Sequence, residues 1–153
     1  MATLRMLCLW YFPTTKFINK WYFSTTMPAA HVHKAKIQEH LQELKDAIAI
    51  GIELRPATIG FHASACSIEL LELYLHKTGK IPIGAQIKHE WFKRPFPGQK
   101  IIPLAERKLK MEFANKTDIL DLLYTIEEKR NKLIYGKSEK SDIKELVETF
   151  TKY

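Results

Sequence analysis

Apolar residues recur at spacings of three and four along most of the chain after residue 27, and no stretch there alternates as a β-strand would. The first such stripe consists of Ile37, Leu41, Leu44, Ile48 and Ile52. Charged and amide side chains fill the opposite side of the same stretch. This spacing places the apolar side chains on one face of an α-helix. The chain is therefore predicted to be all-α.

A second helix is predicted over residues 57–78. It is apolar almost all round, which indicates a central position in the fold. Pro56 is well placed in its first turn, and Gly79 is a suitable C-cap residue. Positions 60–67 hold small residues except at Phe61 and His62, so a partner helix can approach the first half of this predicted helix closely.

The remaining sequence predicts two or three further helices after a long connection. Residues 80–103 are rich in proline and glycine and are predicted to be mostly connection, with a short helix over residues 85–92. Another helix is predicted over residues 104–113, a longer one capped by Thr117 or Asp118, and a last short one capped by Ser141. The predicted architecture is an antiparallel up-and-down bundle of four to five helices over residues 27–153, which suits one domain.

Residues 1–26 differ from the rest of the chain, because they contain no acidic residue and are dense in aromatic ones. A targeting peptide, an apolar arm that covers the domain or its partner, and an upstream start preceding Met27 each fit this composition. We favour an aromatic N-terminal appendage over a separate domain.

The composition points to an acidic partner and a reducing compartment. Lys and Arg number 24 against 17 for Asp and Glu, a net charge of +7 that is compatible with RNA, DNA or a nucleotide as ligand. Cys8 and Cys66 lie far apart without metal-like spacing, which predicts free thiols. No apolar run approaches the ~20 residues that span a bilayer. The sequence predicts a soluble, cytoplasmic protein without a membrane partner.

Arg130 interrupts an apolar stripe, since it follows Ile126 by four residues and precedes Leu133 by three. A guanidinium at such a position must be paired, hydrated in a cleft or used on a ligand, because burying it alone costs several kcal/mol. Its fork of donors suits phosphate oxygens. Neighbouring groups that could serve the same site are Asn131, Lys132 and Tyr135 on its own helix, and Glu69, His62 and Ser64 across the seam. The alternative is an Arg130–Glu69 ion pair that only fixes helix register.

Other kinds of site find less support. Glu69, Glu72 and His76 share one side of the second helix, but without a second set of ligands they are interpreted as a polar seam, and no metal or other cofactor is predicted. The histidines near the start of the first helix are expected to face solvent: His31, His33 and His40. The six glycines are scattered and form no phosphate loop.

Two strings resemble the HEPN superfamily, the higher-eukaryote and prokaryote nucleotide-binding domain, in its small stand-alone prokaryotic or archaeal form. The first is the late-helix string from Glu127 to Gly136, which is similar to the family's Arg-Asn pair followed after four to six residues by His. The second is Ala65-Cys66-Ser67-Ile68-Glu69-Leu70-Leu71, similar to the family's second helix. The resemblance covers roughly residues 30–153.

This resemblance implies a homodimer in which two Arg-bearing turns meet in a cleft. Active members are metal-independent RNases, several of them toxins partnered with a nucleotidyltransferase-type antitoxin. Arg130 and Asn131 match the family pattern, whereas Tyr135 occupies the place of its histidine. A tyrosine with an ordinary pKa near 10 is poorly suited to general base work at neutral pH.

Three functions remain open from the sequence. The preferred one is a HEPN-like module that binds nucleotide or RNA phosphate through Arg130, Asn131 and Tyr135. The second is an endoribonuclease of the same fold, in which Tyr135, His62 or His89 replaces the family's histidine. The third is a structural or interaction protein without a ligand.

Overall fold

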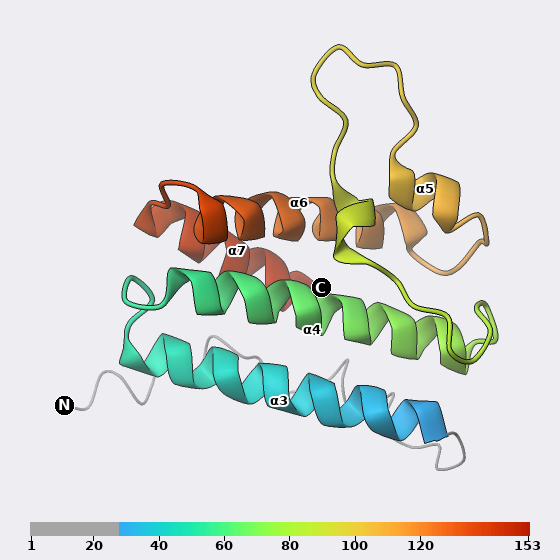
Figure 1. Cartoon of the computed structure of the whole chain (residues 1–153), viewed down its shortest axis with the longest axis horizontal. Helices are drawn as coiled ribbons and strands as arrows, with labels where there is room; N and C mark the ends of the chain where they lie inside the picture. The colour runs from blue at the N-terminus through green and yellow to red at the C-terminus, as the bar shows by residue number, and fades with distance from the viewer. Residues whose placement is uncertain (1–27) are drawn as a thin grey trace.

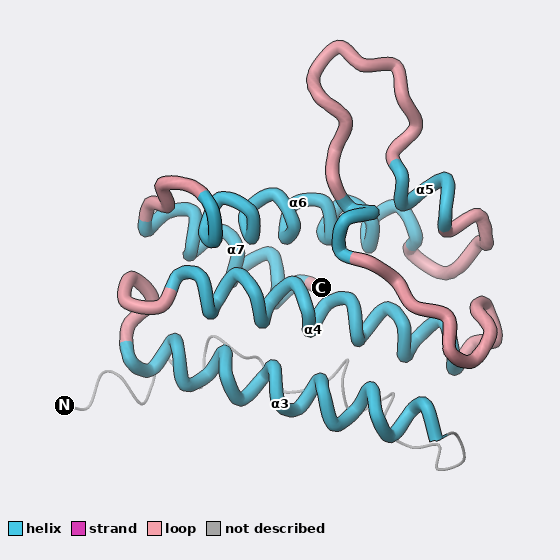
Figure 2. The backbone as a smooth tube through the Cα atoms, in the orientation of Figure 1, coloured by secondary structure: helices cyan, strands magenta, loops and turns pink. Residues whose placement is uncertain are grey.

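The computed structural model describes residues 28–153, and the appendage predicted over residues 1–26 lies outside this range. The described part consists of five α-helices and one short 3₁₀ helix, without a strand (Figures 1 and 2). The all-α class predicted from the apolar spacing is confirmed.

Four long helices form the body of the molecule. Helix α3 (Pro28–Ile50) and helix α4 (Pro56–Lys77) form an antiparallel pair. Helix α6 (Lys116–Tyr135) lies on the other side of α4, and α7 (Lys140–Lys152) packs against both α6 and α4 (Figure 1). Helix α4 is therefore central, as its nearly continuous apolar surface predicted.

The ends of α4 are defined by residues that the sequence singled out. Pro56 occupies the first turn, where its missing N–H costs no hydrogen bond. At the other end Gly79 has a φ of +66°, a left-handed conformation that glycine adopts without steric cost. Its N–H donates to the His76 carbonyl and the N–H of Lys80 to the Leu75 carbonyl, which makes a Schellman motif.

The core consists of two clusters that share α4 and α6. One lies among α3, α4, α6 and α7 and includes Ile37, Leu44, Ile59, Ile126 and Leu146. The other lies where the C-terminal half of α4 meets α6, the 3₁₀ helix and α5, and includes Leu71, Leu75, Phe92, Leu109 and Leu123. Burial of these side chains removes apolar area from water and holds the helices together.

Helices α4 and α6 approach each other closely at Gly60. A Cβ atom at this position would lie 3.2 Å from the Leu133 Cβ and 3.5 Å from the Cα and carbonyl oxygen of Arg130. The small residues at the start of α4 thus let the backbone that carries Arg130 come close, as the sequence indicated.

Two predicted helix caps are wrong. Helix α6 begins at Lys116 after Asn115, which has a φ of +56°, so Thr117 and Asp118 lie inside the helix. Helix α7 begins at Lys140, one residue before Ser141. Its cap is a capping box in which Glu139 and Asp142 each accept a hydrogen bond from the other's backbone N–H.

The short helices in the middle of the chain are also shorter than predicted. The 3₁₀ helix η1 covers only His89–Phe92, because the Ile87 N–H donates to the Glu72 side chain and the backbone before it stays extended. Helix α5 covers Leu104–Lys108 rather than residues 104–113. The chain then turns, and Phe113 packs edge-on against Tyr74 with ring centroids 6.0 Å apart.

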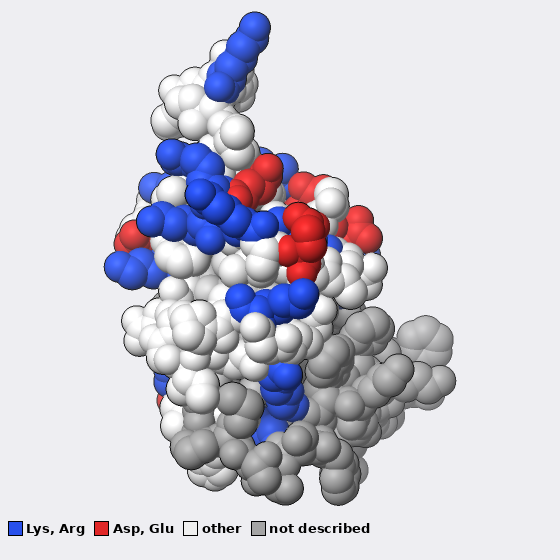
Figure 3. All heavy atoms as spheres, turned by 90° about the vertical axis from the view of Figure 1, so that its right-hand side faces the viewer, with Lys and Arg blue, Asp and Glu red and all other residues white. Residues whose placement is uncertain are grey.

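The connection between η1 and α5 stands out from the body of the bundle (Figures 1 and 2). Arg94 ties its start to α6, with its guanidinium carbon 5.1 Å from the centroid of the Tyr124 ring. Figure 3 shows Lys and Arg side chains close to Asp and Glu side chains on the face at the α5 end. Among the helices of residues 28–153, none is long and apolar enough to cross a membrane.

Candidate functional site

Arg130 lies in the seam between α6 and α4 with only 9% of its surface exposed. Its Nη1 donates to Glu127 Oε1 at 3.3 Å and to Asn131 Oδ1 at 2.8 Å. The alternative of an ion pair with Glu69 across the seam is wrong, because the acidic partner is Glu127, one turn earlier on the same helix. Asn131, which the sequence placed in the site, orients the guanidinium.

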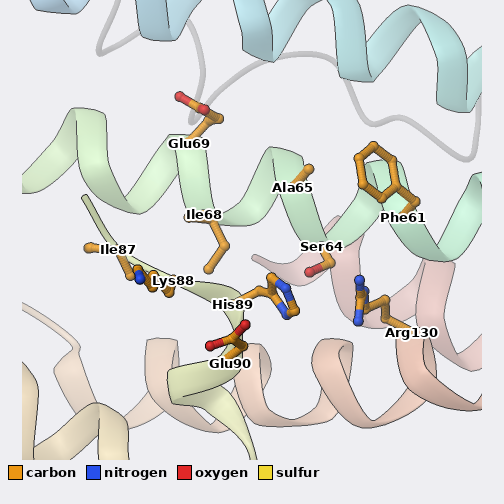
Figure 4. Close-up of a pocket in the computed structure, with 10 residues that line it drawn as sticks. All are labelled: Phe61, Ser64, Ala65, Ile68, Glu69, Ile87, Lys88, His89, Glu90 and Arg130. Atoms are coloured by element: carbon orange, nitrogen blue, oxygen red, sulfur yellow. The ribbon is translucent and has the colours of Figure 1, made fainter.

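The guanidinium borders an open pocket with a volume of about 420 Å³ (Figure 4). The pocket is lined by side chains from α4, from the segment around η1 and from α6: Phe61, Ser64, Ala65, Ile68, Glu69, Ile87, Lys88, His89, Glu90 and Arg130. In residues 28–153 the other guanidinium nitrogens, Nε and Nη2, make no hydrogen bond. Neither is among the fully buried atoms without a partner, so both keep contact with open space.

Glu127 links the elements around the pocket. Its carboxylate is buried and accepts hydrogen bonds from three side chains: Ser64 Oγ at 2.8 Å, His89 Nδ1 at 2.9 Å and Arg130 Nη1 at 3.3 Å. These donors come from α4, η1 and α6, and Figure 4 shows Ser64, His89 and Arg130 converging from the three elements. A buried carboxylate with this many donors is satisfied, which explains how a charge is tolerated here.

The sequence did not single out Glu127, although a signal was present. Glu127 follows the buried Leu123 by four residues and precedes Arg130 by three, so it belongs to the inward face of α6. The sequence offers His89 only as a substitute for the histidine of the superfamily that the chain resembles. Its position could not be derived because the connection that carries it has no helical period.

Two residues that the sequence predicts to share the site with Arg130, Tyr135 and Lys132, do not line the pocket. Tyr135 is 77% exposed, and its ring centroid is 5.8 Å from the Arg130 Cζ. Lys132 pairs with Asp142 of α7 through a 2.7 Å contact, so it ties two helices together.

Glu69 and His62 also differ from their expected roles. Glu69 borders the pocket, but its carboxylate accepts hydrogen bonds from His33 Nδ1 at 2.6 Å and from Lys36 Nζ at 2.9 Å. His62 lies 2.9 Å from His40, between their Nδ1 atoms. Burial lowers the pKa of His40, and the neighbouring His62 lowers it further, so the neutral form of His40 is favoured.

A second polar cluster lies between α3 and α4. His33, expected to face solvent, is buried because it precedes Ile37 by four residues and shares its stripe. Its Nδ1 lies 3.6 Å from Glu72 Oε2, and its ring stacks on that of His76 with centroids 5.3 Å apart. Burial raises the pKa of the Glu72 carboxyl. Helix α3 thus adds His33 to the acidic residues of α4, Glu69 and Glu72.

Comparison of the chain with protein-family models, with curated proteins and with solved structures gives no match.

Proposed function

We propose that the chain is a HEPN-like helical module that binds the phosphate of a nucleotide or of RNA in the pocket at Arg130. The observation that carries this proposal is that Arg130 borders the pocket and uses one nitrogen, Nη1, on its own helix, while Nε and Nη2 make no hydrogen bond within residues 28–153. Guanidinium donors in a partly desolvated site bind phosphate oxygens strongly. The pocket volume of about 420 Å³ lies in the range of small-molecule sites.

Neighbouring side chains suit the other parts of such a ligand. Lys88 borders the same pocket and adds donors for phosphate oxygens. Tyr135 presents an exposed ring beside Arg130, a platform on which a base can stack. In this role Tyr135 recognises the ligand and transfers no proton.

Binding of labelled adenosine monophosphate and of a short single-stranded RNA, measured by fluorescence anisotropy, tests this proposal. Arg130→Met is expected to weaken binding by about 10- to 100-fold, since hydrogen bonds to charged groups contribute roughly 1.5–3 kcal/mol. Arg107→Gln, at an exposed position of α5, is the matched control and is expected to bind as the wild type does. Absence of binding in the wild type would favour a structural or interaction protein instead.

A metal-independent endoribonuclease is the second candidate, favoured by the 2.9 Å hydrogen bond between His89 Nδ1 and Glu127 Oε1. A carboxylate only accepts, so Nδ1 carries the proton and Nε2 is left to accept one. We infer that His89 takes the role of the family's missing histidine. Its Nε2 would take the proton of a 2′-hydroxyl while the 2′-oxygen attacks phosphorus, the bond to the 5′-oxygen breaks, and water protonates the leaving oxygen.

Cleavage of end-labelled RNA in EDTA separates the two candidates. If the chain is a ribonuclease, His89→Gln abolishes cleavage and retains RNA binding, whereas His31→Gln, an exposed histidine of α3, leaves cleavage unchanged. Binding without cleavage in the wild type would support the binding module alone.

A homodimer, and a nucleotidyltransferase-type antitoxin as a further partner, belong to the same proposal. Phe61 supports a contact between copies, because it borders the pocket and is 49% exposed. Sedimentation is expected to show a dimer for the wild type and a monomer for Phe61→Glu. A wild type that sediments as a monomer at every concentration would contradict the dimer.

A further inference from the structure

The cluster between α3 and α4 contains three atoms of metal-ligand type that face one another. They are His33 Nδ1, Glu69 and Glu72 carboxylate oxygens, and all lie within 4.8 Å of one another. His33 Nδ1 is 2.6 Å from Glu69 Oε2 and 3.6 Å from Glu72 Oε2. Ligand atoms around tetrahedral zinc are separated by roughly 3.3 Å, given metal–ligand distances of about 2.0–2.1 Å. Small side-chain shifts would therefore admit an ion.

The second oxygen of each carboxylate is held by another group. Glu69 Oε1 accepts from Lys36 Nζ at 2.9 Å, and Glu72 Oε1 accepts from the backbone N–H of Ile87. Each Oε2 is thereby turned toward His33. Outer partners of this kind orient the ligands in metal sites and raise their affinity for the ion.

An unsatisfied histidine beside the cluster points independently to a missing ligand. His76 is 5% exposed and stacks on His33, and within residues 28–153 its Nδ1 is the only fully buried side-chain nitrogen or oxygen without a hydrogen-bond partner. A buried imidazole nitrogen without a hydrogen-bond partner is costly. A cation held by the cluster would account for the position of this nitrogen. Glu72 and His76 lie one helical turn apart on α4, so they share a face.

We propose that His33, Glu69 and Glu72 bind a divalent transition-metal ion, with His76 as a fourth ligand or a close support, and that the ion joins α3 to α4. Imidazole with carboxylate suits Zn²⁺, whereas Mg²⁺ and Ca²⁺ prefer oxygen ligands alone. Two carboxylates balance the charge of the ion. This site is separate from the proposed phosphate contact at Arg130, although Glu69 borders that pocket as well.

Titration of the full-length, metal-stripped protein with ZnCl₂ in a calorimeter tests this proposal. The wild type is expected to bind one ion per chain, and MgCl₂ at the same concentrations to give no heat. His33→Gln and Glu72→Gln are each expected to weaken Zn²⁺ binding at least about 100-fold, more than the loss of an outer partner. Circular dichroism without metal confirms that each variant is folded.

Two control variants locate the bound ion. His31→Gln removes an exposed histidine of α3, and His62→Gln removes the histidine that pairs with His40. Both are expected to bind Zn²⁺ as the wild type does. Substitution with Co²⁺ should give visible bands without thiolate charge-transfer absorption, because the cluster contains no cysteine. Wild-type affinity in the His33→Gln/Glu72→Gln double variant, loss of binding in His62→Gln, or absence of stoichiometric binding in the wild type would overturn the proposal.

Discussion

A single buried ion pair, Arg130 with Glu127, decides whether the α4–α6 seam can carry a ligand site. Each charge is tolerated because the other is close and because Ser64, His89 and Asn131 complete the hydrogen bonds. Such a pair contributes little net stability relative to apolar residues of the same shape, but removing one partner leaves the other uncompensated.

Glu127→Leu is expected to destabilise the fold by about 3–5 kcal/mol, since it leaves the Arg130 guanidinium buried without its carboxylate. The double variant Glu127→Leu/Arg130→Met is expected to recover most of this loss, because both charges are then absent. Urea denaturation of the three proteins measures the free energies of unfolding. Equal destabilisation of the single and the double variant would show that the pair does not act as a unit.

The single side chain of Cys66 provides a probe of how tightly the core is packed. Its thiol is fully buried, and burial raises its pKa to about 12, so the reactive thiolate is scarce at neutral pH. In a Cys8→Ser background the thiol is expected to react with a disulfide reagent at least about 100-fold more slowly in the native than in the urea-unfolded protein. Rapid native labelling would contradict the packing of α4.

Among the elements, the contact between α4 and α6 depends on the absence of a side chain at Gly60. Gly60→Leu is expected to destabilise the fold by about 1–3 kcal/mol and to weaken ligand binding, because the added side chain would push the Arg130 backbone away. Ala57→Leu is the matched control at an exposed position of the same helix, and little change in unfolding free energy is expected. If both variants unfold like the wild type, the close approach of α4 and α6 is incorrect.

The contact between α6 and α7 should depend on pH through Asp142. Hydrogen bonds from Lys132, the Glu139 backbone N–H and Lys129 hold the pKa of this carboxyl well below its usual range. A carboxyl with a depressed folded-state pKa stabilises the fold fully above its unfolded pKa of about 3.9, and this stabilisation is lost as the pH falls below that value. Asp142→Asn should therefore lower the Tm at pH 7, and its difference from the wild type should shrink between about pH 5 and pH 3. A constant difference over this range would contradict the linkage.

For the whole molecule, the spacing of apolar residues predicts the helices, but it does not predict the contacts between them. The positions of α3, α4 and α6 were predictable because their apolar stripes are long and regular. The partner of Arg130, Glu127, could not be told from acids on other helices, because the spacing of apolar residues does not show which carboxylate a guanidinium contacts. His33 could have been recognised as buried from its spacing to Ile37.

The pocket itself could not be derived from the sequence. It forms where η1 lies over α4 and α6, and η1 belongs to a proline-rich connection without a period. A hydrogen bond from the backbone N–H of Ile87 to the Glu72 side chain fixes this connection. A contact of this kind produces no pattern in the spacing of residues along the sequence. His89 therefore reaches Glu127 through tertiary structure alone.

The most direct test follows the Arg130 side chain in the protein labelled with ¹⁵N-arginine. Its Nε–Hε resonance, assigned by its loss in Arg130→Met, is recorded during titration with adenosine monophosphate and, separately, with adenosine. If the open donors of Arg130 bind phosphate, the resonance shifts saturably with the nucleotide and stays in place with the nucleoside. No shift with the nucleotide, or the same shift with both, would contradict the account.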